Sequence, residues 1–212
     1  PFPPMADVEA WGSYIDKTNK AIIGFTKQQA QTYPAKVASH KLSFSNLYES
    51  TPENLDPERD DFAILYLHGG GFIMGGGDAA IYAAWPIASL ARTRIYSLDY
   101  RMIPEHPYPA ALDDAVEAYR FLLDKYRPEC ISIYGASAGG NLAPAFLLKA
   151  KNLGLPMPAA CAVHSPAADV TESGDTYETN QIVDSVLKGR FPELFEAYVG
   201  ENDPKDPLIS PI

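Results

Sequence analysis

Cysteine, long apolar stretches and positive charge are all sparse in this sequence of 212 residues. Its two cysteines, Cys130 and Cys161, lie in apolar runs that are typical of core strands, so we expect both to be reduced core residues. No apolar run approaches the roughly 20 residues that span a bilayer, and the start, Pro1 to Pro4, has no signal-like apolar segment. We therefore expect a cytoplasmic protein without stable membrane insertion.

The charge balance and the scattered histidines exclude further classes. Lys and Arg total 17 against 27 for Asp and Glu, and this net charge of −10 argues against nucleic acid or an anionic membrane as the main partner. The four histidines lie far apart, and neither a His-Glu-x-x-His motif nor a close Cys pair is present, so we expect no metal. No Gly-Lys-Ser/Thr follows the glycine runs, which excludes a P-loop. We expect no cofactor, and the apolar content of 46% suffices for one full core.

The chain is organised around the stretch from Cys130 to Gly140, which reads C-I-S-I-Y-G-A-S-A-G-G. The run from Ile131 to Tyr134 is typical of a strand, and residues 141–150 are compatible with a helix. The pattern Gly-x-Ser-x-Gly between them fits a nucleophile elbow, which holds the Ser137 hydroxyl above the end of a sheet. A Cβ atom on either glycine of this pattern would collide with the neighbouring strand or helix. On the pentapeptide alone, a glycine-rich turn with an idle serine stays open.

Strand-like and helix-like segments alternate along the chain, which predicts an α/β fold with a parallel, doubly wound sheet and helices on both faces. Trp11, Ile15, Thr18, Ile22 and Phe25 recur at helical spacing and predict an amphipathic helix. Residues 40–49 suggest one or two half-exposed edge strands. The other expected strands are residues 62–67, 94–98, 131–134 and 159–164, and the other expected helices are residues 78–91, 108–126 and 141–150.

Three polar or glycine-rich motifs follow the expected strands. His68-Gly69-Gly70-Gly71, Asp99-Tyr100-Arg101 and Ser137 each come where a strand ends. Ligands of open α/β sheets bind beyond the carboxyl ends of the strands, so we expect these motifs to meet at one edge. Serine attack on an acyl group creates an oxyanion, and backbone N–H groups of Gly70, Gly71 and Ala138 are the expected donors to it.

Two other patterns point to different chemistry. Gly75 to Ala80 matches Gly-x-Gly-x-x-Ala with Asp99 at a plausible distance for a ribose contact, as in dinucleotide binders. That turn should follow a strand directly, and here residues 68–74 intervene, which argues against dinucleotide binding. Asp113 and Asp114 look like paired acids. Because adjacent residues face apart on a helix, helix-dipole stabilisation is the better interpretation of this pair.

The chain resembles the hormone-sensitive lipase family of α/β-hydrolases, of the bacterial carboxylesterase type, over about residues 40–212. The stretches that carry the resemblance are His68 to Phe72, Asp99 to Arg101, Pro104 to Ala110, Gly135 to Ala143 and Asp203 to Pro211. By this resemblance Ser137 is the nucleophile, and Gly70, Gly71 and Ala138 form the oxyanion hole. The resemblance also divides the chain into an N-terminal helical cap segment (1–39), a hydrolase core (40–174), a second cap segment (175–200) and a return to the core (201–212).

The family's acid and histidine are absent from the expected places. In the family both lie on loops after two further strands, and no histidine follows His164 in this sequence. Without those strands, the apolar strand at residues 159–164 would be an open sheet edge with unpaired backbone groups. We therefore expect a further C-terminal segment of the same protein that supplies the strands, the acid and the histidine.

The function that these features predict is a serine carboxylic-ester hydrolase that acts through an acyl-enzyme. The resemblance implies short to medium acyl esters as substrates and a possible homodimer as the assembly. Two alternatives remain: a non-catalytic small-molecule binder of the same fold, and a lactone hydrolase.

Overall fold

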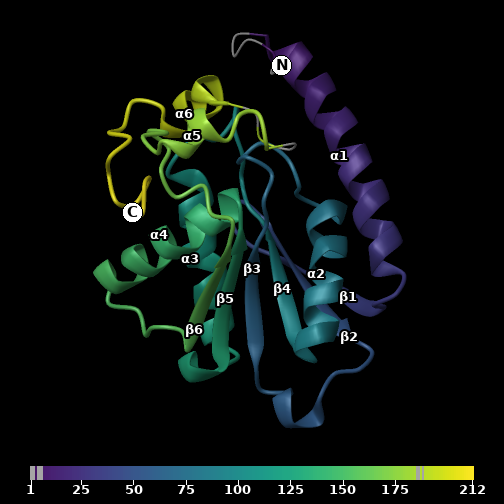
Figure 1. Cartoon of the computed structure of the whole chain (residues 1–212). Helices are drawn as coiled ribbons and strands as arrows, with labels where there is room; N and C mark the ends of the chain where they lie inside the picture. The colour runs from purple at the N-terminus through teal and green to yellow at the C-terminus, as the bar shows by residue number, and fades with distance from the viewer. Residues whose placement is uncertain (1–2, 4–6, 185–186, 188) are drawn as a thin grey trace.

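A six-stranded sheet with helices on both faces forms the centre of the computed structural model, which describes residues 3, 7–184, 187 and 189–212 (Figure 1). The strand order is β1-β2-β4-β3-β5-β6. Strands β3 to β6 run parallel to one another, whereas β2 pairs antiparallel with both β1 and β4. The strands are β1 (Ala35–Lys41), β2 (Asn46–Pro52), β3 (Ala63–Leu67), β4 (Arg94–Asp99), β5 (Ile131–Ala136) and β6 (Ala160–His164). The predicted mostly parallel, doubly wound sheet is confirmed.

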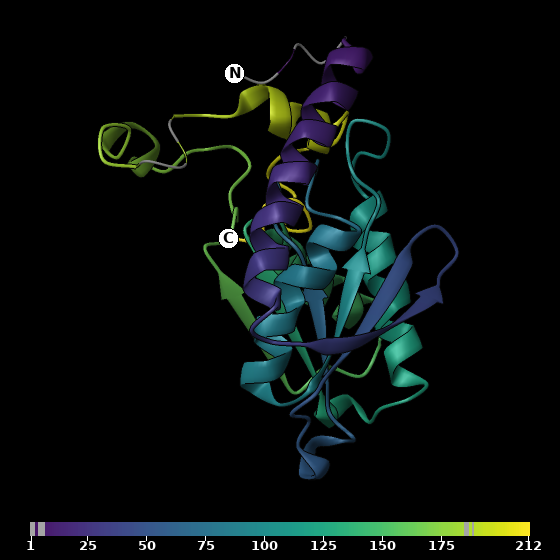
Figure 2. The same cartoon turned by 90° about the vertical axis from the view of Figure 1, so that its right-hand side faces the viewer.

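The helices divide between the two faces of the sheet. Helices α1 and α2 lie together on one face, and α3 and α4 lie on the other, while α5 and α6 lie beyond the carboxyl ends of the strands (Figures 1 and 2). The α-helices are α1 (Val8–Ala30), α2 (Asp78–Ala91), α3 (Ala110–Leu123), α4 (Ala138–Asn152), α5 (Thr176–Thr179) and α6 (Pro192–Val199); two short 3-10 helices are η1 (Pro57–Arg59) and η2 (Pro128–Cys130).

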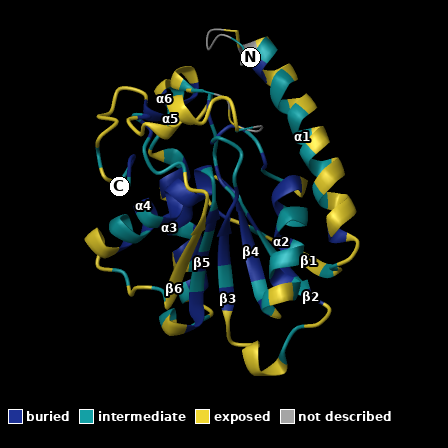
Figure 3. Ribbon diagram, in the orientation of Figure 1, coloured by how far each residue is buried: buried dark blue, intermediate teal, exposed yellow. Residues whose placement is uncertain are grey.

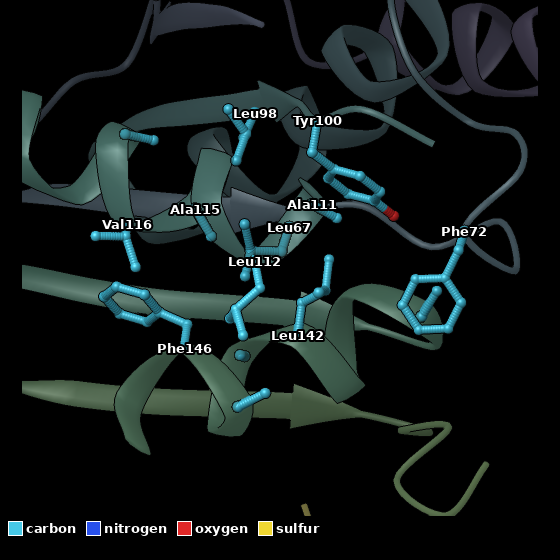
Figure 4. Packing of buried hydrophobic residues seen from close by; sticks show 14 of the residues in the cluster. Leu67, Phe72, Leu98, Tyr100, Ala111, Leu112, Ala115, Val116, Leu142 and Phe146 are labelled. Atoms are coloured by element: carbon cyan, nitrogen blue, oxygen red, sulfur yellow. The ribbon is translucent and has the colours of Figure 1, made fainter. Parts of the chain in front are cut away.

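Strand β3 shows how the sheet buries both of its faces. Leu65 and Leu67 belong to the large apolar cluster against α3 and α4, where Leu112 and Leu142 also pack (Figure 4). Tyr66, which points to the opposite face, packs with Ala84 and other residues of α2 in a second cluster. A strand that is covered on both sides has no polar face, which explains why its sequence is continuously apolar.

The outer strands differ from two of our expectations. Residues 40–49 do not form only edge strands, because β2 is paired on both sides and only β1 lies at the edge. The other edge is β6, whose residues are all exposed (Figure 3). Cys161 lies on β6 and is therefore exposed, so its expected place in the core is wrong, whereas Cys130 is buried. The apolar run around Cys161 could not reveal this, since burial depends on what covers the strand.

Helix α1 confirms the predicted amphipathic pattern only in part. Trp11 is fully buried, but Phe25, at the other end of the same stripe, is 64% exposed.

Within the described residues, none of the helices combines the length and the apolar character needed to cross a membrane. Residues 1–2 and 4–6 of the first expected cap segment, and residues 185–186 and 188 of the second, lie outside the described residues.

Candidate active site

Ser137 lies at the junction between β5 and α4. Its backbone has φ 53° and ψ −114°, a left-handed φ that a residue with a side chain adopts only under strain. Its backbone N–H donates to the carbonyl oxygen of His164 at 2.9 Å, and its own carbonyl accepts from Asn141 N–H at 3.0 Å. The half-buried hydroxyl makes no hydrogen bond within the described part of the chain. The sharp strand-to-helix turn predicted from Gly-x-Ser-x-Gly is present.

The two glycines of this turn allow three elements to touch through their backbones. A Cβ atom on Gly135 would lie 2.1 Å from the carbonyl oxygen of Gly139. A Cβ atom on Gly139 would lie 1.9 Å from the carbonyl oxygen of Leu67, at the end of β3. Both distances are far below van der Waals contact, so only glycine fits, as the sequence pattern predicted.

A tight glycine turn follows β3 and lies against the serine. Gly70 and Gly71 have φ angles of 121° and 62°, and Gly70 O accepts hydrogen bonds from Ile73 N–H and Met74 N–H, each at 3.1 Å. A Cβ atom on Gly69 would lie 3.2 Å from the Cβ of Ser137, which shows how closely the turn approaches the elbow.

Three backbone N–H groups at this place have no acceptor within the described residues: those of Gly70, Gly71 and Ala138. Ala138 is the first residue of α4, where a helix leaves its N–H groups unused and carries partial positive charge. Unused N–H groups beside a serine hydroxyl are the donors that an oxygen with developing negative charge requires. The structure therefore brings together all four residues that the sequence predicted for the site.

A pocket of about 420 Å³ opens over this constellation. Gly70, Gly71 and Ser137 form part of its wall, whereas Ala138 is fully buried behind them. Apolar side chains dominate the remaining wall, and they are Phe72, Met74, Pro166, Ala167, Leu187, Phe191, Leu194 and Phe195. Most of the polar lining side chains come from the segment that carries α5, and they are Thr176, Tyr177, Asn180, Gln181 and Asp184; Ser165, which follows β6, also lines the pocket. The pocket thus joins the serine to residues 176–195.

His68 supports the glycine turn from behind. Its Nδ1 lies 2.7 Å from the carbonyl oxygen of Gly69, so Nδ1 carries the proton and donates it. Its ring stacks on Tyr100 with centroids 4.1 Å apart, and the Tyr100 hydroxyl donates to the His68 carbonyl oxygen at 2.8 Å. Burial lowers the pKa of His68, which keeps the ring neutral.

The other three histidines lie on different elements of the fold. His40 contacts Glu49 in the β1–β2 hairpin, with His40 Nε2 2.8 Å from Glu49 Oε2. His106 is exposed in the loop after β4, and His164 is exposed on β6, where it contacts Ser137 only through its backbone. None of the four histidines is hydrogen-bonded to the hydroxyl of Ser137.

Asp99 has a role that the sequence did not indicate. Its Oδ1 accepts from the backbone N–H of Gly77 at 3.0 Å, and a Cβ atom on Gly76 would lie only 2.3 Å from the same oxygen. The Tyr48 hydroxyl donates to the other carboxylate oxygen at 3.4 Å. Asp99 therefore holds the second glycine turn, residues 75–77, rather than a ribose. Among the described residues, no three His, Cys, Asp or Glu side chains gather as metal ligands.

The ion pair of Asp114 was missed by sequence reasoning. Asp114 is 1% exposed, and its carboxylate accepts from Arg101 through the backbone N–H at 2.8 Å and through Nη2 at 2.8 Å. These hydrogen bonds raise the pKa of the Arg101 guanidinium. Helix-dipole stabilisation is therefore the wrong interpretation of Asp114, while Asp113 pairs with Lys149 at the surface. The signal was the position of Asp114 in a stripe of buried small residues that includes Ala111 and Ala115.

Comparison with known proteins gives concordant matches. Residues 64–212 match the model of a family described by its alpha/beta hydrolase fold. An acetyl-hydrolase of Streptomyces hygroscopicus is 36% identical over 164 residues, which cover 76% of this chain and 55% of that protein. The crystal structure of an esterase, E25, superposes with a TM-score of 0.87 at 29% identity, covering all of this chain and 68% of that one.

A hormone-sensitive lipase from a metagenome library superposes with a TM-score of 0.81 at 33% identity, covering 93% of this chain and 66% of that structure. The chain spans about half the length of the curated relatives it matches.

Proposed function

Because the chain belongs to the alpha/beta hydrolase fold family and is similar to its hormone-sensitive-lipase-like esterases, we propose that it is a carboxylesterase with Ser137 as its nucleophile. The observation that carries the proposal is the strained Ser137 backbone, which holds the hydroxyl in the pocket beside the unused N–H groups of Gly70 and Gly71. Strain of this kind persists where the surrounding structure enforces it, and here the close backbone contacts at Gly135 and Gly139 hold the turn in place.

The proposed reaction has two steps, acylation of Ser137 and hydrolysis of the acyl-enzyme. Ser137 Oγ attacks the ester carbonyl carbon while a general base takes the hydroxyl proton, and the carbonyl oxygen becomes an oxyanion. The N–H groups of Gly70, Gly71 and Ala138 donate to that oxyanion. Collapse of the intermediate breaks the bond to the alcohol oxygen, which receives the proton from the base. Water then attacks the acyl-enzyme by the same route, with the acid released and the serine proton restored.

The proposed mechanism needs a histidine as general base, and none of the four histidines in this sequence takes that role. His68 is neutral but donates to Gly69 O, and within the described residues neither His40, His106 nor His164 is hydrogen-bonded to the hydroxyl. We therefore assign the base, and the acid that orients it, to residues of the protein beyond this sequence. The greater length of its relatives supports this assignment.

The pocket favours esters with a short to medium acyl chain. Its volume of about 420 Å³ and its apolar wall of Phe72, Leu194 and Phe195 suit a neutral acyl group of limited length. The acetyl-hydrolase among its relatives is consistent with the short end of this range. In this proposal residues 175–200 act as a cap, because described side chains of this segment, among them Thr176 and Leu194, line the pocket over Ser137.

A non-catalytic binder of the same fold is the second candidate. The observation that favours it is the Ser137 hydroxyl, which has no hydrogen-bond partner within the described residues. A fluorophosphonate probe separates the two, since only an activated serine reacts with it. We expect labelling of the full-length protein and none of the Ser137→Ala variant. Binding of an ester without labelling or turnover would support the binder instead.

The substrate class can be defined by measuring kcat/KM for p-nitrophenyl esters of increasing acyl length and for a series of γ-lactones. The proposal predicts the highest kcat/KM for acetyl to hexanoyl esters. A preference for lactones would assign the protein to lactone hydrolysis.

A further inference from the structure

The glycine turn beside Ser137 is a closed loop whose two limbs touch. The first limb contains Gly69 and Gly70, and the second contains Met74 and Gly75. A Cβ atom on Gly75 would lie 2.5 Å from Gly69 O, and one on Gly70 would lie 2.0 Å from Met74 O. Because these backbone segments are in contact, a shift of Met74 and Gly75 also shifts Gly69 and Gly70.

A side chain from a distant helix holds the second limb. Gly75 is buried, and its N–H donates to Oδ1 of Asn19, in the middle of α1, at 2.9 Å. Asn19 is half-buried. Helix α1 packs along α2, which begins directly after this loop (Figures 1 and 2). The hydrogen bond therefore ties the loop to an element 56 residues away in sequence.

The peptide between Gly69 and Gly70 transmits this constraint to the site. Its carbonyl oxygen is Gly69 O, which lies between His68 Nδ1 and Gly75, and its N–H is that of Gly70. A trans peptide is planar and its C=O and N–H point in opposite directions, so a rotation of the carbonyl turns the N–H by the same angle. Gly75 has φ 93° and no side chain to resist rotation. The hydrogen bond to Asn19 therefore fixes the position of Gly75, and Gly75 in turn limits the rotation of the Gly69–Gly70 peptide.

We propose that Asn19 is a positioning residue of the reaction, which sets the direction of the Gly70 N–H through Gly75 and Gly69 O. The proposal rests on the proposed function, because the direction of this N–H matters only if an oxyanion forms beside Ser137. Asn19 does not touch the substrate, so it acts on the transition state and not on ground-state binding.

Asn19→Leu, which keeps the approximate size but removes the acceptor, tests this in the full-length protein. We expect kcat for p-nitrophenyl butyrate to fall about tenfold, less than the 10²–10³ for loss of an oxyanion donor, with KM changed less than about twofold. Binding of a trifluoromethyl ketone should weaken by the same factor as kcat. This inhibitor accepts Ser137 Oγ at its carbonyl carbon, its oxygen becomes the oxyanion, and the serine proton passes to the base.

Two further variants separate positioning from a general loosening of α1. Asn19→Asp keeps an acceptor oxygen and should restore kcat to within about threefold of wild type. Lys27→Ala removes the contact of the Lys27 ammonium with the Tyr82 ring on α2, 5.7 Å from its centroid, without touching the loop. It should leave kcat and inhibitor affinity unchanged.

The outcomes distinguish the two levels of the proposal. A wild-type protein that neither hydrolyses the ester nor binds the ketone covalently refutes the proposed function itself. An active wild type whose Asn19→Leu variant keeps kcat and inhibitor affinity overturns the role of Asn19. So does a loss that Asn19→Asp fails to restore, a loss that Lys27→Ala reproduces, or a change confined to KM.

Discussion

The same substitution, glycine to alanine, should change the stability of this protein in opposite directions at two helical positions. In α4, a Cβ atom at Gly139 would lie 1.9 Å from Leu67 O, 2.4 Å from Leu67 C and 2.6 Å from His68 O, where ordinary contacts are 3.4–4 Å. All three atoms are backbone, so β3 or α4 must shift. Overpacking of this kind costs typically 1–3 kcal/mol, and with three backbone clashes we expect about 3 kcal/mol or more for Gly139→Ala.

In α1, the added Cβ at Gly24 would meet nothing within 4 Å, and Gly24 is exposed. Only helix propensity then changes, and alanine is better than glycine by about 0.8–1.0 kcal/mol. For a chain of this size, Gly24→Ala should raise Tm by about 2–4 °C. Urea unfolding followed by far-UV circular dichroism measures both variants. Equal stability of Gly139→Ala and wild type, or equal losses in the two variants, would refute the backbone contact between α4 and β3.

Three further predictions concern the site and its surroundings. Gly70→Ala puts a Cβ 2.0 Å from Met74 O at φ 121°, so ester turnover should fall by at least about 100-fold, and activity close to wild type would contradict the assigned turn. Asp114→Ala removes the hydrogen bonds between Arg101 and a buried carboxylate and should cost about 1.5–3 kcal/mol, against about 0–1 kcal/mol for the surface pair lost in Asp113→Ala, as urea titrations of both variants would show. Burial acts to raise the pKa of Asp169, but hydrogen bonds from Ser173 and Thr171 outweigh it and lower this pKa to about 2, below its unfolded value. The stability from these bonds is therefore present above about pH 4 and lost as the pH falls toward 2, so wild type should lose more stability over this range than Asp169→Asn. Parallel pH profiles of the two proteins would contradict this.

The central strands and the elbow could be predicted because their signals are local. A continuous apolar run marked β3 within one residue, since a strand covered on both faces has no polar face. The expected strand at residues 94–98 likewise matches β4 within one residue. Gly135 and Gly139 marked the strand-to-helix turn, because a backbone contact excludes every other residue there. The proximity of Gly70, Gly71 and Ser137 could be predicted because each follows the carboxyl end of a strand in a parallel sheet.

The remaining features depend on partners that are distant in sequence. Asn19 does not belong to the amphipathic stripe predicted for α1, and only the packing of α1 brings it to Gly75. Asp114 resembled a helix-dipole residue until Arg101 was placed beside it. Cys161 has an apolar neighbourhood in the sequence, yet β6 leaves it exposed. The domain boundaries, the homodimer and the cytoplasmic location stay predictions.

Trapping the acyl-enzyme tests the central claim most directly. The full-length protein is mixed with p-nitrophenyl butyrate, quenched in acid within the first turnover, and digested for mass spectrometry. Our account predicts one butyryl group on the peptide that contains Ser137, and neither this group nor turnover in the Ser137→Ala variant. Ester turnover that persists in Ser137→Ala, or a butyryl group on another residue, would contradict it.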